Sequence, residues 1–371
     1  MRPKQMEEVL YNAILNRDDL GFYGDRGIGK SNIVEHTIER VRQEILSNSI
    51  ALPKWTVKPS PENKSIVNTL FIHASISEPT DQRGLPAIKL VKIAEDKEAQ
   101  KAVFVPFGEL DQMINATGIL VVFLDDFGQA PPLVQASFMQ IILARRINEH
   151  VISSSCIFVV CTNERGKDTG VHGMLEPMKD RFLTLVKLET DWKQWVEWAT
   201  SKRIVPSVIA YHKWVGNKDK TNDHLNNYRP KNDMTRSPSP RGWEFISKTI
   251  EHNYPIECLE EMFCGTIGEV EGHAFYSFLR EYKDLVHPDL IIANPDTSDI
   301  PINKPSVMWS VLTALASRTD RKNFSNVYKY LLRLPPEWSE FLMVDIVRLN
   351  PDLKKSKEYI MYKALHSDTE I

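Results

Sequence analysis

Residues 24–31 have the composition and spacing of a phosphate-binding loop. They read Gly-x-x-x-x-Gly-Lys-Ser and lie between an apolar run at 20–23 and a helical pattern at 31–46, the strand–loop–helix context that this motif requires. Glycines let backbone N–H groups surround a phosphate, and the helix N-terminus adds a favourable dipole. We expect the whole loop to contact a nucleotide: Gly24, Asp25, Arg26, Gly27, Ile28, Gly29, Lys30 and Ser31.

Charged side chains at two places match the needs of phosphoryl transfer. Lys30 is expected to reach the β- and γ-phosphates, and Ser31 to bind Mg²⁺. A wholly apolar run at 119–124 is followed by Asp125 and Asp126. An acid at the end of a central strand can hold Mg²⁺ through water, which assigns Asp125, and the next acid, Asp126, can polarise the attacking water. The expected substrate and cofactor are ATP and Mg²⁺.

Three further polar residues are candidates for the same site. Asn163 follows the apolar run 156–161, where an amide can position the attacking water, although asparagine is also common in turns after strands. Arg181 precedes the run 183–188, and Arg241 opens a helical pattern. Each arginine is either a surface charge or a cation for the equatorial phosphate oxygens, a role worth ~10³–10⁵ in rate.

The elements that must position these residues change character along the chain. In the first half, apolar runs alternate with helical patterns, which predicts a parallel sheet covered by helices. The expected strands are 20–23, 69–73, 119–124, 156–161 and 183–188, and the expected helices are 31–46 and 132–147.

After Thr190 the pattern is helical. Trp192, Trp195 and Trp198 recur every three residues and form one packing stripe. A polar stretch at 215–240 predicts a loop or linker. Helical patterns follow at 243–252, 256–282, 306–318 and 337–349. We expect a nucleotide-binding domain at 1–190, a helical lid at 191–285 and a helical extension at 286–371.

The composition is that of a globular protein. Of 371 residues, 42% are hydrophobic and 26% charged, and the net charge of −3 gives no reason to expect a nucleic-acid partner. The cysteines have no zinc-ligand spacing, and Cys156 and Cys161 are expected to be buried thiols. No signal-peptide or membrane-spanning run is present, so a cytoplasmic location is expected.

The order of motifs resembles the MoxR branch of the AAA+ ATPases. After the loop at 24–31, the matching segments are Phe-Leu-Asp-Asp at 123–126, Ala-Pro-Pro-Leu-Val-Gln-Ala at 130–136, Arg-Arg-Ile at 145–147, Cys-Thr-Asn at 161–163, the segment 168–175, Asp-Arg-Phe at 180–182 and Pro-Arg-Gly-Trp-Glu at 240–244. Segments 78–86, 265–269 and 330–335 extend the resemblance over nearly the whole chain.

This resemblance implies an α/β P-loop domain of the AAA+ type, with three αβα layers and a parallel sheet, followed by an all-helical lid and a helical C-terminal region. It also implies a ring, usually a hexamer, with ATP at subunit interfaces. The ring would act like a chaperone on a protein substrate or adaptor, often one with a von Willebrand A domain. By position, Arg181 would be the arginine finger donated to the neighbour and Arg241 the sensor of the second domain.

The chain departs from the family pattern at three positions. Asp126 replaces the usual Glu and is shorter by one carbon–carbon bond, roughly 1.5 Å, so we expect slow hydrolysis. Arg26 and Glu164 each stand where a proline is common, with little consequence.

The leading interpretation is therefore an ATP-driven remodeller of protein complexes. A DNA-acting factor, such as a helicase or helicase loader, is the alternative from another class, and residues 145–150 could form a pore-facing turn for either substrate. A third hypothesis is an ATP-gated scaffold with little hydrolysis. Residues 162–165 lack the Asn-Lys-x-Asp pattern that reads guanine, so GTP is not expected.

Overall fold

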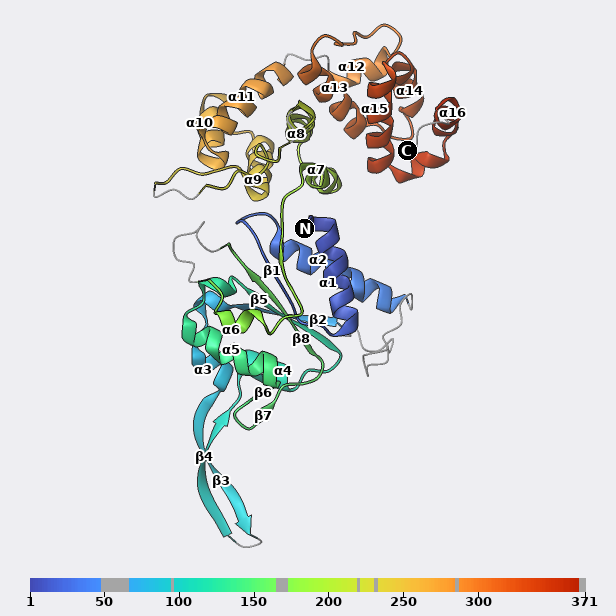
Figure 1. Ribbon diagram of the computed structural model, residues 1–371. Coiled ribbons are helices and arrows are strands. Elements are labelled where there is room, and N and C mark those ends of the chain that lie inside the picture. The colour runs from blue at the N-terminus through green and yellow to red at the C-terminus, as the bar shows by residue number, and fades with distance from the viewer. Residues whose placement is uncertain are drawn as a thin grey trace. The chain divides into compact units, whose positions relative to one another are not determined.

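The computed structural model describes residues 1–47, 67–94, 97–164, 173–218, 221–229, 233–283 and 287–366. The chain divides into two compact units, Met1–Glu189 and Thr190–Ile371 (Figure 1). Parts of the segments 162–165, 168–175 and 215–240, which were singled out above, lie outside the described residues.

The first unit contains a five-stranded parallel sheet in the order β2-β5-β8-β1-β9. Its strands are β1 (Leu20–Tyr23), β2 (Val67–His73), β5 (Ile119–Asp125), β8 (Cys156–Thr162) and β9 (Leu185–Lys187). Every residue of β8 is buried, as is every residue of β5 before Asp125. Cys156 and Cys161 are therefore buried thiols, as predicted. Such apolar strands fit a sheet that is covered on both faces.

Helices cover both faces of the sheet and give three αβα layers (Figure 1). They are α1 (Pro3–Asn16), α2 (Lys30–Leu46), α3 (Pro79–Arg83), α4 (Gly108–Ile114), α5 (Pro132–Ala144) and α6 (Glu176–Lys179). Because side chains alternate along a strand, Val121 and Phe123 enter the core with α1 and α2, whereas Leu120 and Val122 enter the core with α4 and α5. The predicted fold class, a three-layer αβα domain with a parallel sheet followed by a helical region, is confirmed.

The sequence analysis did not predict two antiparallel hairpins in this unit. One pairs β3 (Leu85–Ala94) with β4 (Lys97–Val105) and extends away from the sheet (Figure 1); the other pairs β6 (Arg146–Ile147) with β7 (His150–Val151). The helix predicted over 132–147 is therefore wrong at its end. Helix α5 stops at Ala144 because Arg145 has a left-handed backbone, with φ of 50°.

The second unit is helical in its described residues. Its helices are α7 (Trp192–Ser201), α8 (Pro206–Lys218), α9 (Pro240–Glu251), α10 (Ile256–Ile267), α11 (Glu269–Lys283), α12 (Pro288–Ala293), α13 (Pro305–Arg318), α14 (Phe324–Leu332), α15 (Pro336–Leu349) and α16 (Lys357–Leu365). Residues 215–218 continue α8 and are not part of a loop, which corrects that prediction. The pattern over 256–282 is two helices, since Gly268 has φ of 87° and ends α10.

Two hydrophobic cores occupy this unit. One involves α7 to α11 and includes Trp192 and Trp195 of the predicted packing stripe, with Trp198 packed against it. The other involves α12 to α16. The division into a lid and an extension at residue 285 stays a prediction. None of the helices formed by the described residues has the length and apolar character needed to span a membrane.

Candidate nucleotide site

The carboxyl ends of three neighbouring strands meet at one edge of the sheet. Strand β8 lies between β5 and β1, so the residues that follow these strands are close in space. Ligands of open α/β sheets bind at this edge. The backbone N–H of Gly24 donates to the carbonyl oxygen of Thr162 over 3.2 Å, which joins the loop after β1 to the end of β8. The predicted residues 24–31, 125–126 and 163 thus lie at one edge.

The backbone of the loop requires its glycines. A Cβ on Gly24 would lie 2.7 Å from the carbonyl oxygen of Leu188, which is closer than atoms pack. Gly27 and Gly29 have φ of 71° and 88°, values that other residues rarely adopt. Gly29 is the residue before α2, whose first N–H groups have no partner inside the helix. Such a loop and helix N-terminus suit a phosphate group.

Lys30 is the buried cation of this loop, with 8% of its surface exposed. Its ammonium donates to the carbonyl oxygens of Gly24 at 3.0 Å and Asp25 at 2.9 Å, and to Asn163 Oδ1 at 2.8 Å. An ammonium has three N–H donors, so all of them are used. A phosphate oxygen that binds Lys30 must therefore replace one of these acceptors. Of the other loop side chains, Asp25 is half-buried, Arg26 exposed and Ile28 buried.

Ser31 and Asp125 offer oxygen ligands of the kind that Mg²⁺ prefers. The Ser31 hydroxyl donates to Asp125 Oδ2 over 3.1 Å, so the two side chains are already adjacent. The other oxygen, Asp125 Oδ1, accepts from the backbone N–H of Asp126 at 3.0 Å. No group of three or more His, Cys, Asp or Glu residues in the described part of the chain could hold a metal. A Mg²⁺ ion at Ser31 and Asp125 would instead complete its shell with phosphate oxygens and water.

Asp126 has a left-handed backbone, with φ of 50°. Aspartate and asparagine tolerate this conformation better than longer side chains do, which is a local reason for Asp in place of Glu. Asn163 Nδ2 donates to Asp126 Oδ1 at 3.3 Å. Burial, and then the neighbouring Asp125 carboxylate, raises the pKa of Asp126 above its usual value. A raised pKa makes this carboxylate a better proton acceptor.

The two predicted arginines do not belong to this hydrogen-bonded group. Arg181 follows α6 and is half-buried, and its Nε is buried with no hydrogen-bond partner among the described residues. Arg241 lies in the second unit, on the exposed side of the first turn of α9, a helix capped by Ser239.

Three further residues were not predicted to have a role of their own: His73 and Thr162 end strands at this edge of the sheet, and Gln135 lies on α5. His73, at the end of β2, pairs in register with Asp125. Burial and Asp125 raise the pKa of Asp126, and His73 opposes part of this rise, after the larger opposing effects of Lys30 and Arg26. Thr162 Oγ1 accepts from the backbone N–H of Gly128 at 3.0 Å. Gln135 is a fully buried polar residue on α5. A polar residue inside the apolar α5 pattern was the available signal for Gln135, whereas His73 required the strand order.

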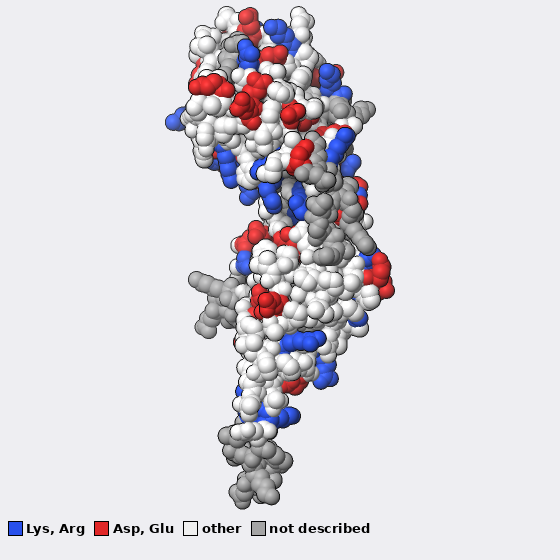
Figure 2. Space-filling model, turned by 90° about the vertical axis from the view of Figure 1, so that its left-hand side faces the viewer, with Lys and Arg blue, Asp and Glu red and all other residues white. Residues whose placement is uncertain are grey.

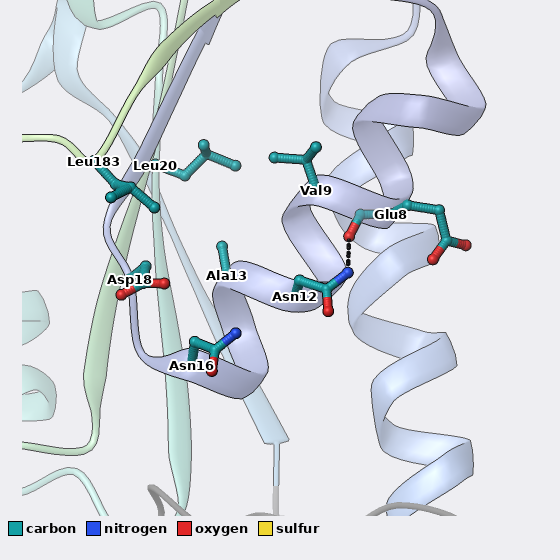
Figure 3. Close-up of a pocket in the computed structure, with 8 residues that line it drawn as sticks. All are labelled: Glu8, Val9, Asn12, Ala13, Asn16, Asp18, Leu20 and Leu183. Carbon is teal, nitrogen blue, oxygen red and sulfur yellow. Dashed lines mark hydrogen bonds between the residues drawn. The ribbon is translucent and has the colours of Figure 1, made fainter.

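A hollow of about 270 Å³ lies elsewhere in the first unit, between α1 and the β1 side of the sheet (Figure 3). Its lining residues are Glu8, Val9, Asn12, Ala13, Asn16, Asp18, Leu20 and Leu183. None of them belongs to the predicted nucleotide site, so the shape of this hollow says nothing about phosphate binding. Leu183 is 69% exposed and lies two residues after Arg181.

Comparison with known proteins gives distant structural likenesses. No family model and no curated protein matches the sequence. A RuvB P216G mutant of Thermotoga maritima is 13% identical with a TM-score of 0.41, over 89% of this chain and 86% of that one. The Orc1 protein of Aeropyrum pernix, solved with DNA, is 12% identical with a TM-score of 0.36, over 88% of this chain and 80% of that one. NtrX of Brucella abortus is 11% identical with a TM-score of 0.39, over 98% of this chain and 66% of that one. Because these values are low, the interpretation depends on the geometry above.

Proposed function

We propose that this chain binds ATP with Mg²⁺ at residues 24–31 and hydrolyses it. One observation carries this proposal: Lys30, Asn163 and Asp126 form a hydrogen-bonded series directly beside a glycine loop at a helix N-terminus. A cation, an amide and a carboxylate in this order supply a phosphate ligand, a group that orients water and a proton acceptor.

Each residue then has one task. Lys30 exchanges Asn163 or a loop carbonyl for a phosphate oxygen, and the loop N–H groups hold the remaining phosphates. Ser31 and Asp125 would bind Mg²⁺, which would neutralise phosphate charge. Asp126 accepts a hydrogen bond from the attacking water and takes its proton, while Asn163 fixes the direction of that water. The γ-phosphoryl group is transferred to the water oxygen, and ADP leaves.

We further propose that Arg181 completes the site of a neighbouring subunit in a ring, which the family resemblance suggests is a hexamer. The Nε of Arg181, which has no hydrogen-bond partner within the described part of the chain, and the exposed Leu183 two residues later support a contact with another chain. Arg241 would act as the sensor of the helical lid. Sedimentation with and without a non-hydrolysable ATP analogue tests assembly; a monomer at micromolar concentration in both conditions contradicts a ring.

The work done by this ring would be remodelling of a protein partner. On the face of the second unit that Figure 2 shows, both acidic and basic side chains are present among the described residues. Phosphate backbones are usually met by a basic face or stripe, so a protein partner fits better than DNA. Salt-dependent binding of DNA would reverse this preference.

The direct test is ATP binding by Lys30→Ala. Loss of a charged hydrogen-bond donor typically costs 1.5–3 kcal/mol, so affinity should fall roughly 10- to 100-fold or more. Calorimetric titration with MgATP measures the affinity, and circular dichroism checks the fold. The matched control is Lys4→Ala, at an exposed position of α1. Wild-type affinity in Lys30→Ala would overturn the site.

A further inference from the structure

Gln135 is a fully buried polar residue on α5. Its side chain has no exposed surface. Its Nε2 donates to the carbonyl oxygens of Ala130 at 3.1 Å and Gly173 at 3.0 Å, and its Oε1 accepts from the backbone N–H of Leu175 at 3.0 Å. A buried amide is costly unless it is bonded, and here each end of the amide holds backbone.

These bonds join two separate segments of the first unit. Ala130 ends the turn that begins at Asp126, whereas Gly173 and Leu175 precede α6. The same segments are joined a second time, because the Gly173 N–H donates to the carbonyl oxygen of Gly128 at 3.0 Å. The chain at 173–175 is thus fixed to the turn that follows Asp126.

A hydrogen-bonded path leads from this anchor to Arg181. The Met178 N–H donates to Leu175 O at 2.9 Å, and the Arg181 N–H donates to Met178 O at 3.1 Å. Met178 itself is fully buried in the α5 core. The position of the Arg181 backbone therefore depends on where Leu175 is held, and Gln135 holds Leu175.

We infer that Gln135 is a positioning residue for Arg181, and that it acts on the reaction of the neighbouring subunit and not on the reaction of its own. This inference rests on the proposed function, in which Arg181 is supplied to the next site. Gln135 forms no hydrogen bond with the phosphate-binding loop in the bonds described, and its bond to Ala130 lies at the end of the turn that is farther from Asp126. Its main effect should therefore appear in the subunit that provides the arginine.

Mixed assemblies test this directly. Subunits with Arg181→Ala keep a nucleotide site but lack the arginine. Subunits with Lys30→Ala keep the arginine but bind ATP so weakly that their own site stays largely empty at an ATP concentration that fills the other. Their mixture should regain ATPase activity that neither has alone. Gln135→Met, which preserves volume, is then placed either in the Lys30→Ala subunit or in the Arg181→Ala subunit.

Because small misplacements of a catalytic group cost up to ~10²-fold, we expect Gln135→Met to lower activity about 10- to 100-fold in the Lys30→Ala subunit and less than about twofold in the Arg181→Ala subunit. Equal losses in both arrangements would show a general effect on folding and overturn the inference. A loss confined to the Arg181→Ala subunit would overturn it too, because Gln135 would then serve its own site.

A second variant guards against misfolding of Gln135→Met. Gln135→Glu keeps the shape and the oxygen that accepts from Leu175. Because burial against two carbonyl oxygens favours the protonated carboxyl, it also keeps one of the two donors, so it should show the same asymmetry with a smaller loss. Symmetric losses in this variant also contradict the inference. If the reference mixture without any Gln135 change stays inactive, Arg181 is not supplied in trans. In that case the proposed ring function fails together with the inference.

Discussion

Two buried polar side chains at the edge of the sheet in the first unit bond to each other, whereas a buried histidine of the second unit is enclosed by aromatic rings. Lys30 and Asn163 are bonded to each other. His212 has its ring centroid 4.6 Å from that of Trp195 and 4.4 Å from that of Trp243. Neither ring nitrogen of His212 has a hydrogen-bond partner in the described part of the chain.

This difference separates two uses of burial. The partners of Lys30 can be exchanged for phosphate oxygens, so changes there should alter ligand binding more than folding. His212 is enclosed by aromatic rings, and this environment favours the neutral form of its imidazole. The second unit also contains a buried ion pair, Lys213 with Asp345, which joins α8 to α15. Substitutions of His212 or Lys213 should therefore change stability and leave ATP affinity unchanged.

The largest effect on stability is expected for Lys213→Met. Removing one partner of a buried ion pair leaves an uncompensated charge and costs about 3–5 kcal/mol. Arg348, whose Nη1 lies 3.7 Å from Asp345 Oδ1, offsets part of this cost. Urea titration measures the free energy of unfolding, with exposed Lys202→Met as the control. The double variant Lys213→Met/Asp345→Leu should recover most of the loss; equal stability of Lys213→Met and Lys202→Met would contradict a structural role.

A smaller effect on stability is expected from His212 when the pH is lowered. Burial, and then the neighbouring His224, lowers the pKa of His212 well below its ordinary value. The imidazole of the unfolded chain therefore takes up a proton near pH ~6.5, whereas that of the folded chain stays neutral. The free energy of unfolding falls as the pH decreases, by roughly 1 kcal/mol between about pH 7 and about pH 5.5.

His212→Phe should remove this part of the pH dependence, because Phe fits the aromatic core and does not titrate. Urea titrations at the two pH values measure it, and His252→Phe, on the exposed end of α9, is the control. If wild type and His212→Phe lose the same stability on acidification, the buried histidine is not responsible.

The smallest effect concerns Asn163. Because Asn163 occupies one donor of Lys30, Asn163→Ala should free this donor and tighten binding of a non-hydrolysable ATP analogue by roughly 2- to 10-fold, the worth of about one hydrogen bond. Turnover should fall in the same variant, since the water loses its orienting amide. Calorimetry with Asn12→Ala as control measures the affinity. Weaker binding by Asn163→Ala would show that Asn163 holds the nucleotide in the ground state.

The contacts at the sheet edge could be predicted because they depend on local patterns. The glycine loop, the acids after an apolar run and the asparagine after another are each visible in a short window, and parallel strands bring their ends together. The glycine at 268 is also a local signal for a helix end, but the prediction of one helical pattern over 256–282 overlooked it. The end of α5 was not, because Arg145 adopts the left-handed conformation without the glycine that normally marks it.

What remained hidden depends on pairing between distant segments. His73 lies beside Asp125 only because β2 is the neighbour of β5. The β3–β4 hairpin places Lys89 opposite Lys101, a like-charge pair that no local propensity favours. The hydrogen bonds of Gln135 connect Ala130, which precedes β8 in the sequence, with Gly173 and Leu175, which follow it. None of these follows from periodicity.

The central claim is that binding and hydrolysis of ATP depend on different residues of one hydrogen-bonded series. Asp126→Asn tests it most directly, because Asn suits the left-handed backbone and cannot accept a proton. Asp126→Glu is the companion variant; its longer reach should raise turnover or leave it unchanged, despite some backbone strain.

Phosphate release and MgATP affinity should both be measured on the same preparation of Asp126→Asn. General-base catalysis contributes ~10²–10⁴ to rate and little to ground-state binding, so turnover should fall by that factor while affinity stays at the wild-type value. Hydrolysis at the wild-type rate in Asp126→Asn would contradict the account and favour a scaffold that is gated by nucleotide binding alone.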